Sequence, residues 1–399
     1  MRIAIDARPA VDPRRTGIGM YTQALARHVP AAMPDDRFLA WYLDVKGIGR
    51  AARRFTGWAP NLREHASRIP SRVFGPVSSR LGVPRLEWLA GRSDLVIATN
   101  FLPPPTRSLG VVLVVHDLAF DTMPETAPHH DRRWRRAFAR RLRDAAAVIV
   151  PSEATRTDLL AHHAVDATRV HVVAHGTDAD AFTPASLIEV DELRARRRID
   201  GPYIAFLGGQ EPRKNLERLV AAFGLLDDRD VSLVIAGGAV RWAPAYATQV
   251  ERAVASLPPE RRARVIQLGY VDDVDRRALL SGAEILAYPS LAEGFGFPVL
   301  EGFAANVPVL TSSTSSLPEV AGGAAMLVDP TDPAAIAAGL NELLEDNDLR
   351  NVMRAAGTAR VAGFTWQRCA RETAAVLRLA AQHGRKTAAG GRAAATNTP

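Results

Sequence analysis

Short apolar runs alternate with amphipathic stretches along nearly the whole chain. In the first half, apolar runs of strand length occur at 2–7, 37–43, 95–99, 111–115, 147–152 and 170–175. In the second half they occur at 203–208, 231–238, 265–269, 284–290, 307–312 and 325–329. Runs of this length, bounded by turn residues, are typical of strands that are buried on both faces.

Stretches of helical length separate many of these runs. They lie at 20–29, 131–145, 215–226, 245–256, 275–281, 298–305, 333–345 and 349–357. Strands that alternate with helices predict parallel sheets covered on both faces. Two such halves predict two doubly wound α/β domains. In such sheets ligands bind beyond the carboxyl ends of the strands, so we expect a cleft between the two domains, with the functional residues at strand ends.

Turn residues and composition suggest the domain boundaries. A turn-rich junction near 174–184 separates a first domain, 1–181, from a second, 182–364. A last helix is predicted at 366–382, within a segment that spans 365–383. The tail, 384–399, carries no bulky apolar residue, so we expect it to be disordered.

The composition is that of an ordinary globular protein. The 399 residues are 47% apolar and 23% charged, and no apolar run approaches the ~18 residues that are needed to span a bilayer. Asp6 and Arg8 interrupt the apolar start, which therefore predicts a first strand rather than a signal peptide. Cys369 is the only cysteine. This excludes an internal disulfide and a cysteine-cluster zinc site, and it fits a reducing cytoplasm.

The net charge of +7 is unevenly distributed. Residues 1–180 hold 26 Lys and Arg against 18 Asp and Glu, whereas residues 181–399 hold 24 against 25. A basic half favours an anionic partner. We find no zinc-finger, RNA-binding or basic-zipper motif, so an anionic membrane face or a polyanionic substrate fits better than nucleic acid. The alternative is a preference for arginine that needs no partner.

The segment 131–144 carries much of this basic charge. At helical spacing its apolar side chains form one stripe, and an adjacent face is lined by arginines at 132, 136, 140 and 143. A basic amphipathic helix is typical of membrane-surface contacts. We expect the apolar stripe to be ordinary core, and the arginine face to be available to lipid headgroups.

The nonapeptide EGFGFPVLE, 293–301, is the most informative string in the chain. It follows a predicted strand and places Glu293 in the loop beyond that strand. Pro298 suits the first position of a new helix, so Glu301 lies one turn inside it. The helix start would offer N–H groups at Val299 and Leu300 to a phosphate. Two acids around a phosphate site suit a nucleotide-diphosphate sugar. The alternative is a structural loop in which both acids are only solvated.

Three further motifs also follow predicted strands. Gly17 and Gly19 lie in TGIGMY before the first helix, where an ordinary glycine turn would be equally consistent. His116 ends the run VVLVVH, as either a core histidine or a substrate contact. Arg213 and Lys214 precede a helix in GGQEPRKN. Cations are disfavoured at a helix start unless an anion binds there, so this pair predicts a diphosphate site.

A fourth motif, LGYVDD, contains Val271 and Asp273. It is either a plain acidic turn or a contact to a nucleobase. Two D-x-D strings, Asp178–Asp180 and Asp273–Asp275, could in principle hold Mg²⁺. The first lies in the linker and the second at a helix start, where acids are stabilising anyway. We therefore expect no metal site.

These motifs, in this order, resemble those of the retaining glycosyltransferases of family 4, which have the GT-B fold, and most closely their mannosyltransferase-like branch. The resemblance covers residues 1–382. It implies two Rossmann-like domains, with the last helix crossing back onto the first. One departure stands out: Gly209 occupies a position where many members carry an arginine.

The resemblance also implies roles for the residues. Glu293 and His116 would contact the donor sugar, and Glu301 would bind the ribose. Arg213 and Lys214 would stabilise the leaving diphosphate, so these two cations, Glu293 and His116 are the expected catalytic group. The donor-binding set would be completed by residues of the glycine loop, the base-contacting loop and the nonapeptide: Gly17, Gly19, Val271, Asp273, Gly294, Phe295, Gly296, Val299 and Leu300.

The implied activity is transfer of a hexose, most simply mannose, from a nucleotide-diphosphate sugar to a hydroxyl of a glycan or lipid-linked saccharide, with retention of configuration. GDP-mannose is the expected donor, both from the resemblance and because Asp273 could accept hydrogen bonds from guanine. UDP-sugars and other GDP-sugars are alternatives. No metal or other cofactor is expected, since Arg213 and Lys214 supply the positive charge. The expected location is the cytoplasm, with the inner membrane face as a contact surface. A nucleotide-sugar epimerase or phosphorylase on the same fold, or a binding protein without catalysis, remains an alternative.

Overall fold

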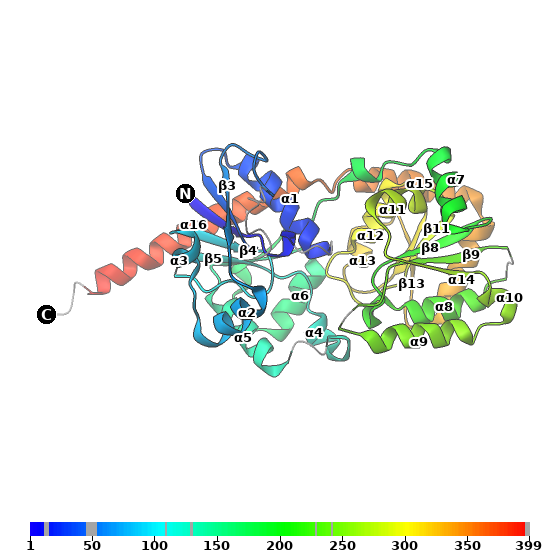
Figure 1. Cartoon of the computed structure of the whole chain (residues 1–399), viewed down its shortest axis with the longest axis horizontal. Helices are drawn as coiled ribbons and strands as arrows, with labels where there is room; N and C mark the ends of the chain where they lie inside the picture. Colours follow the sequence, from blue (N-terminus) through cyan, green and yellow to red (C-terminus); the bar gives the residue numbers. More distant parts are fainter. Residues whose placement is uncertain are drawn as a thin grey trace. The chain divides into compact units, whose positions relative to one another are not determined.

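The computed structural model describes residues 1–11, 16–44, 54–107, 110–127, 131–227, 230–240 and 242–395. The chain forms two compact units (Figure 1). Unit 1 comprises Met1–Leu118, His130–Gly176 and Trp366–Pro399, and unit 2 comprises Ala119–His129 and Thr177–Thr365. Each unit has one fully parallel sheet, which confirms the predicted pair of doubly wound α/β domains.

The sheet of unit 1 has seven strands in the order β3-β2-β1-β4-β5-β6-β7. Their bounds are β1 Arg2–Asp6, β2 Arg37–Leu43, β3 Leu62–Ser67, β4 Leu95–Ala98, β5 Gly110–Val114, β6 Ala147–Val150 and β7 Val170–Val172. The order reverses between β1 and β4. This is the doubly wound arrangement, in which the crevice at the reversal is the usual ligand site.

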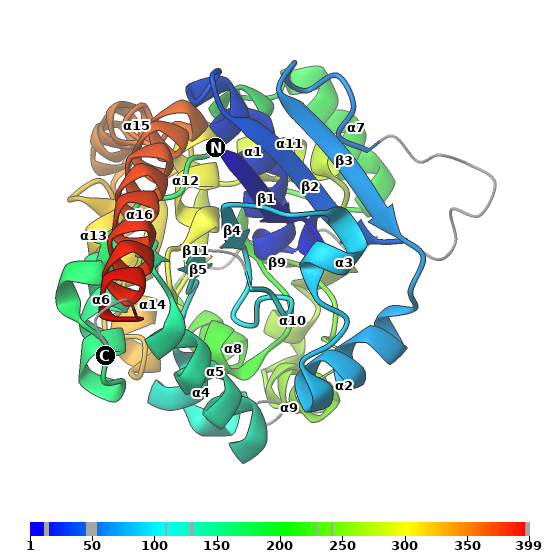
Figure 2. The same cartoon turned by 90° about the vertical axis from the view of Figure 1, so that its left-hand side faces the viewer.

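Alternation along β1 divides the core of unit 1 between the two faces of its sheet. Ile3 and Ile5 belong to a cluster that includes α1 (Gly17–Ala32) and α16 (Trp366–Ala395), and Ala4 belongs to a second cluster with α2 (Ser71–Leu81) and α3 (Leu86–Ala90). Figure 2 shows α16 beside α1 on this unit. The chain therefore returns to unit 1 after finishing unit 2. Unit 1 also contains α5 (Arg132–Asp144), α6 (Glu153–His162) and the short helices η1 (Pro9–Val11) and η3 (Ala167–Arg169).

Unit 2 has six strands in the order β10-β9-β8-β11-β12-β13. Their bounds are β8 Tyr203–Leu207, β9 Ser232–Ala236, β10 Val265–Gly269, β11 Ile285–Tyr288, β12 Val309–Ser312 and β13 Met326–Val328. Helices α8 (Leu216–Gly224) and α9 (Pro244–Ala255) lie on one face, and α11 (Asp273–Ser281) and α12 (Phe297–Ala304) on the other (Figure 1). The remaining helices of unit 2 are α4 (Ala119–Thr122), η2 (Pro124–Thr126), η4 (Ala179–Phe182), α7 (Leu187–Arg197), η5 (Pro212–Lys214), α10 (Pro259–Arg262), α13 (Leu317–Ala321), α14 (Pro333–Glu345) and α15 (Asn347–Val361).

The predicted strands and helices all occur, with bounds that shift by a few residues. β3 was not predicted, because its sequence LREHAS has no apolar run. It is the edge strand of its sheet and pairs with β2 alone. Helices α2, α6 and α7 were not predicted either. The tail differs from expectation as well. Helix α16 extends to Ala395 rather than ending near 382, and the alanine content of this stretch favours a helix.

Candidate active site

The reversal point of the unit 2 sheet lies between β8 and β11. The loop after β8 leads into η5, which contains Arg213 and Lys214, and the loop after β11 carries Glu293. Asn215 joins these loops: it adopts the left-handed conformation at φ 61°, and its Nδ2 donates to the carbonyls of Pro289 and Pro330 at 2.9 and 2.6 Å. Two distant motifs thus meet at the position where a doubly wound sheet binds its ligand.

Glu293 is at the centre of this group. Its Oε2 accepts from Nη1 of Arg213 at 2.6 Å, and its Oε1 contacts Nζ of Lys214. Oε1 also accepts from the hydroxyls of Tyr288, at 2.6 Å, and Ser290, at 2.9 Å. The carboxylate is therefore held from four sides, with its orientation fixed.

The cations are balanced by more than one acid. Arg213 donates through Nη2 to Glu211 at 2.8 Å, as well as to Glu293. Burial, with the charge of Arg213, lowers the pKa of Lys214. Burial alone would raise the pKa of Glu293, but Arg213 and Lys214 outweigh it and lower this pKa to about 2. Burial raises the pKa of Tyr288 well above its usual value, so its phenol remains a donor at neutral pH.

This pKa shift predicts an acid-sensitive contribution to stability. The pKa of Glu293 falls from an ordinary 4.5 to about 2 in the folded chain, so the ionised carboxylate stabilises unit 2 above pH 4.5, and this stabilisation is lost as the pH falls toward 2. We expect the difference in unfolding free energy between the wild type and Glu293→Gln to be largest above pH 4.5 and to shrink below it. Chemical denaturation of both proteins from pH 7 to 2.5 tests this. A difference that does not vary with pH would contradict it.

The second acid of the nonapeptide forms an ion pair of its own, separate from the group around Glu293. Glu301, on α12, is 2% exposed and pairs with Arg276 of α11. Burial raises the pKa of Glu301, and Arg276 opposes this. The helix start differs from expectation at Val299, whose N–H donates to the carbonyl of Gly296 at 3.1 Å and is therefore not free for a phosphate. The carbonyl is held there by the left-handed Gly296, at φ 109°.

The residues of the base-contacting loop and the start of α11 differ in their burial and in their partners. Val271 is half-buried between β10 and α11, and Asp273 is exposed at the first position of α11. Asp275 is buried and pairs with Arg196 at 3.0 Å and Arg197 at 2.5 Å. One acid of the second D-x-D string therefore joins α11 to α7. Among the described residues, no group of three or more His, Cys, Asp and Glu side chains could hold a metal ion.

Gly294, Phe295 and Leu300 complete the predicted set in unit 2. All three are buried, and Phe295 packs edge-on against Phe297 and Phe364 at ring distances of 5.5 and 5.8 Å. The hydroxyl of Ser316 bridges the carbonyls of Glu293 and Phe295 at 2.8 and 2.9 Å. This part of the nonapeptide shapes the loop through its packing and backbone. Its contact with a donor stays a prediction.

His116 lies in unit 1, in a buried cluster that the sequence did not reveal. Its Nε2 donates to the carbonyl of Thr99 at 2.8 Å, and its Nδ1 is 3.4 Å from Nε2 of His175. The ring of Tyr21 packs against both imidazoles, with centroids 5.0 and 4.3 Å away. Burial lowers the pKa of both histidines. The expected sugar contact of His116 stays a prediction, because both of its ring nitrogens have partners within unit 1.

The glycine loop also has a structural explanation. Thr16 caps α1 by accepting from the N–H of Gly19 at 3.1 Å. A Cβ at Gly19 would lie 2.9 Å from the carbonyl oxygen of Pro9, so close packing against η1 requires glycine there. Gly17 is exposed at the first position of α1. Its role toward a ligand stays a prediction.

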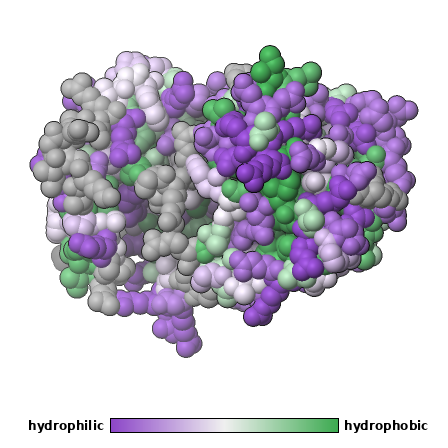
Figure 3. Space-filling model, turned by 45° about the vertical axis from the view of Figure 1, so that its right-hand side comes forward, coloured by the Kyte–Doolittle hydropathy of each residue, from purple (hydrophilic) through white to green (hydrophobic). Residues whose placement is uncertain are grey.

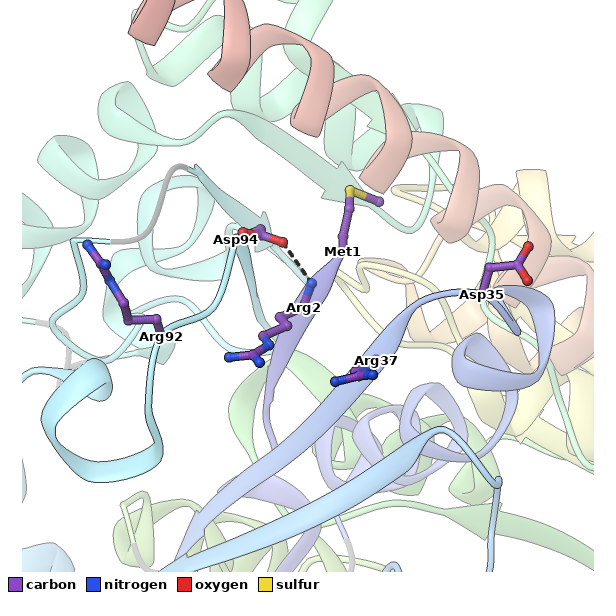
Figure 4. Close-up of a pocket in the computed structure, with 6 residues that line it drawn as sticks. All are labelled: Met1, Arg2, Asp35, Arg37, Arg92 and Asp94. Carbon is purple, nitrogen blue, oxygen red and sulfur yellow. Dashed lines mark hydrogen bonds between the residues drawn. The ribbon is translucent and has the colours of Figure 1, made fainter.

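A cavity of about 410 Å³ lies at the amino-terminal ends of β1, β2 and β4 (Figure 4). It is lined by Met1, Arg2, Asp35, Arg37, Arg92 and Asp94. None of the predicted site residues lines it, and doubly wound sheets bind ligands at the opposite ends of their strands. The surface drawn in Figure 3 is mainly hydrophilic, with scattered hydrophobic residues.

Comparison with known proteins decides the family. The model for "Glycosyl transferases group 1" matches residues 189–360, and the model for "Glycosyltransferase Family 4" matches residues 17–181. O-antigen chain mannosyltransferase B of Escherichia coli is 31% identical over 281 residues, which cover 69% of this chain and 72% of that enzyme. The chain belongs to glycosyltransferase family 4. It is therefore a transferase.

Other relatives of this family 4 glycosyltransferase agree. The MMP alpha-(1->4)-mannosyltransferase of Mycolicibacterium hassiacum is 30% identical, over 68% of this chain and 65% of that enzyme. Among solved structures, HepE of Anabaena in complex with UDP and glucose has a TM-score of 0.70 at 17% identity, covering 98% of this chain and 100% of that one. WaaG, a glycosyltransferase involved in lipopolysaccharide biosynthesis, has a TM-score of 0.68 at 15% identity, with 94% and 98% coverage. These structures confirm the GT-B fold.

Several residues of this glycosyltransferase's candidate site were not predicted from the sequence. Tyr288 and Ser290 lie inside the predicted strand EILAYPS, and Glu211 precedes the predicted cations by two and three positions. Arg276 and His175 lie far along the chain from the acid and the histidine that they contact. Polar side chains at a strand's carboxyl end were the available signal for Tyr288 and Ser290. The sequence carried no such signal for Arg276.

Proposed function

We propose that this enzyme transfers mannose from GDP-mannose to a hydroxyl of a glycan or lipid-linked saccharide, with retention of configuration and without a metal ion. The observation that carries the proposal is the meeting of Arg213, Lys214 and Glu293 at the reversal point of unit 2. The two relatives named above, both mannosyltransferases, support the choice of sugar.

The two cations suit a leaving diphosphate. A guanidinium has five N–H donors, and Arg213 directs Nη1 to Glu293 and Ala292 and Nη2 to Glu211. If a bound phosphate shared these donors, they would stabilise the negative charge that develops on it as the sugar–phosphate bond breaks. Lys214, buried beside Arg213, would add a second positive charge at the same point.

Glu293 suits a positioning role better than a nucleophilic one. Two cations and two hydroxyls hold its oxygens, and its pKa of about 2 keeps it ionised at neutral pH. A carboxylate in such contacts is a fixed acceptor for a sugar hydroxyl. The acceptor hydroxyl would then attack from the side of the leaving phosphate, which retains the configuration without a covalent intermediate on the enzyme.

The base preference rests on Asp273. Its side chain is exposed at the start of α11, where a carboxylate could accept from the N–H groups of guanine. We expect GDP to raise the melting temperature more than UDP does at equal concentration. Differential scanning fluorimetry with GDP, UDP and ADP measures this. Stabilisation by UDP alone would contradict the guanine assignment and leave the transferase assignment intact.

The reaction itself needs a product analysis. Incubation of the purified enzyme with GDP-mannose and a panel of saccharide acceptors should give a mannoside whose anomeric proton, observed by NMR, has the configuration of the donor. An inverted product would contradict retention. An epimerase would instead convert the donor into another nucleotide sugar without an acceptor, which the same spectra would reveal.

Helix α5 supports a peripheral contact with an anionic membrane. Phe138 and Leu142 are buried in the core, as expected, whereas Arg132, Arg136 and Arg140 are exposed. The contact would therefore be electrostatic rather than insertive. None of the described helices is long and apolar enough to cross a membrane.

We expect the wild type to co-sediment with vesicles that contain anionic phosphatidylglycerol. The double variant Arg136→Gln/Arg140→Gln should bind them about 30-fold more weakly at low salt, because each basic residue near the surface contributes about 1 kcal/mol. The matched control is Arg252→Gln/Arg262→Gln, which changes two exposed arginines of unit 2. Equal losses in both double variants would show that net charge, rather than the α5 face, is responsible.

A further inference from the structure

Arg276 is the residue in the site of unit 2 whose role no motif indicates. It lies on α11, and its Nη2 contacts Oε1 of Glu301 on α12. The side chain of Glu301 is 3% exposed and that of Arg276 is 20% exposed. The pair is therefore largely buried, where an ion pair is specific in geometry and its loss leaves an uncompensated charge.

The guanidinium of Arg276 is fixed from a second side. Its carbon lies 4.9 Å from the centre of the Phe182 ring, on η4. Helix α11 is itself anchored to α7, because Asp275 pairs with Arg196 and Arg197. Arg276 thus projects from an immobilised helix and is stacked on an aromatic ring. This arrangement favours one orientation of the guanidinium, and hence of the carboxylate that it holds.

The contact leaves one carboxylate oxygen of Glu301 available. Arg276 binds Oε1, and Oε2 accepts no hydrogen bond from the described residues. A carboxylate with one oxygen fixed and the other available is suited to accept from a hydroxyl of a ligand. The other charged groups that act on Glu301 are Asp273, on α11, and Lys214, on η5. Asp273 opposes the ionised form, and Lys214 favours it.

We propose that Arg276 is a positioning residue for the nucleotide: it holds Oε1 of Glu301 so that Oε2 is presented to a ribose hydroxyl. The inference rests on the proposed function and on the ribose contact that the family resemblance implies for Glu301. It adds that the affinity for nucleotide depends on a residue outside the nonapeptide. Because burial favours the protonated form of Glu301, removal of Arg276 should also make nucleotide binding sensitive to pH.

Isothermal titration calorimetry with GDP, from pH 5.5 to 8.5, tests the proposal on the full-length chain. We expect Arg276→Met, which keeps the bulk of the side chain, to weaken GDP binding about tenfold at pH 7. Its affinity should fall further as the pH is lowered through a range where the wild type is unchanged. In transfer assays, the KM for the donor should rise while kcat stays within about twofold. Arg276→Lys should restore most of the affinity.

The matched control is Arg277→Met on the same helix. Arg277 pairs with Glu189 instead, and that pair is more exposed. If Arg276→Met binds GDP as the wild type does at every pH, the proposal is wrong. It is equally wrong if Arg276→Met only lowers the melting temperature, as Arg277→Met would. If Arg276→Met does not fold, Arg276→Gln gives the same comparison, with Arg276→Lys as the variant that keeps the positive charge. A wild type that binds no nucleotide would instead overturn the proposed function, and this inference with it.

Discussion

Replacement of Lys214 by alanine is expected to lower kcat for sugar transfer by about two to three orders of magnitude, the usual effect of removing one group that stabilises developing charge. Its ammonium contacts Glu293 and Tyr288 and lies 4.9 Å from the centre of the Tyr288 ring. In a buried site the ammonium acts at low dielectric, where a charge has more effect than in water. The substitution also removes one of the two cations that hold Glu293 in place.

The loss must be separated from a packing defect. Lys214→Met keeps a long apolar stem and removes only the charge, so it should lose activity to a similar extent. Arg252→Ala, on the exposed face of α9, should have the activity of the wild type. Steady-state kinetics of the three variants, with circular dichroism to confirm folding, provide the comparison. If Lys214→Met keeps the kcat of the wild type, the leaving-group role of Lys214 is wrong.

Replacement of Gly237 by alanine is expected to destabilise unit 2 by about 4 kcal/mol, at the upper end of single-residue effects. Gly237 directly follows β9, with φ 137°, in a region that residues with side chains rarely adopt. A Cβ there would lie 1.9 Å from the carbonyl oxygen of Gly208 and 2.6 Å from its carbon. Backbone atoms cannot move aside as a flexible side chain can. The loop that leads from Gly208 to Arg213 would therefore shift, and nucleotide binding would weaken as well.

The neighbouring glycine provides the control for this prediction. Gly238→Ala introduces the same methyl group one residue later, where nothing lies within 4 Å of the new Cβ. It should change the stability of unit 2 by less than about 0.5 kcal/mol. Thermal and urea denaturation of both variants measures the difference. Equal stability of Gly237→Ala and Gly238→Ala would show that the close approach to Gly208 is not required.

Close packing of the loop against Val240 explains why residue 209 is a glycine in this chain. The family resemblance leads us to expect an arginine at this position, and the chain has glycine. A Cβ at Gly209 would lie 2.9 Å from Cγ1 of Val240. Glu211 and Arg213 pair at 2.8 Å a few residues later. In this protein the loop packs against Val240. The cations that it places at the reversal point of the sheet are Arg213 and Lys214.

The sequence predicted the fold because the signal for buried strands is local. Apolar runs such as those at β1 and β8 are fully buried, and their alternation with helices indicates a parallel sheet without further information. β3 was not predicted because it has no such local apolar run. As an edge strand with a polar sequence it takes its conformation from pairing with β2, and pairing between distant segments leaves no mark in a local pattern.

By itself the sequence determined which residues stand at strand ends: Arg213, Lys214 and Glu293 follow their strands in motifs that are contiguous in the chain. The tertiary structure decided their partners. Arg276 reaches Glu301 and His175 reaches His116 only because helices and strands far apart in the chain pack together. Conformational preferences act over a few residues, whereas ion pairs, burial and pKa values depend on neighbours in space, and these exist only once the sheets have assembled.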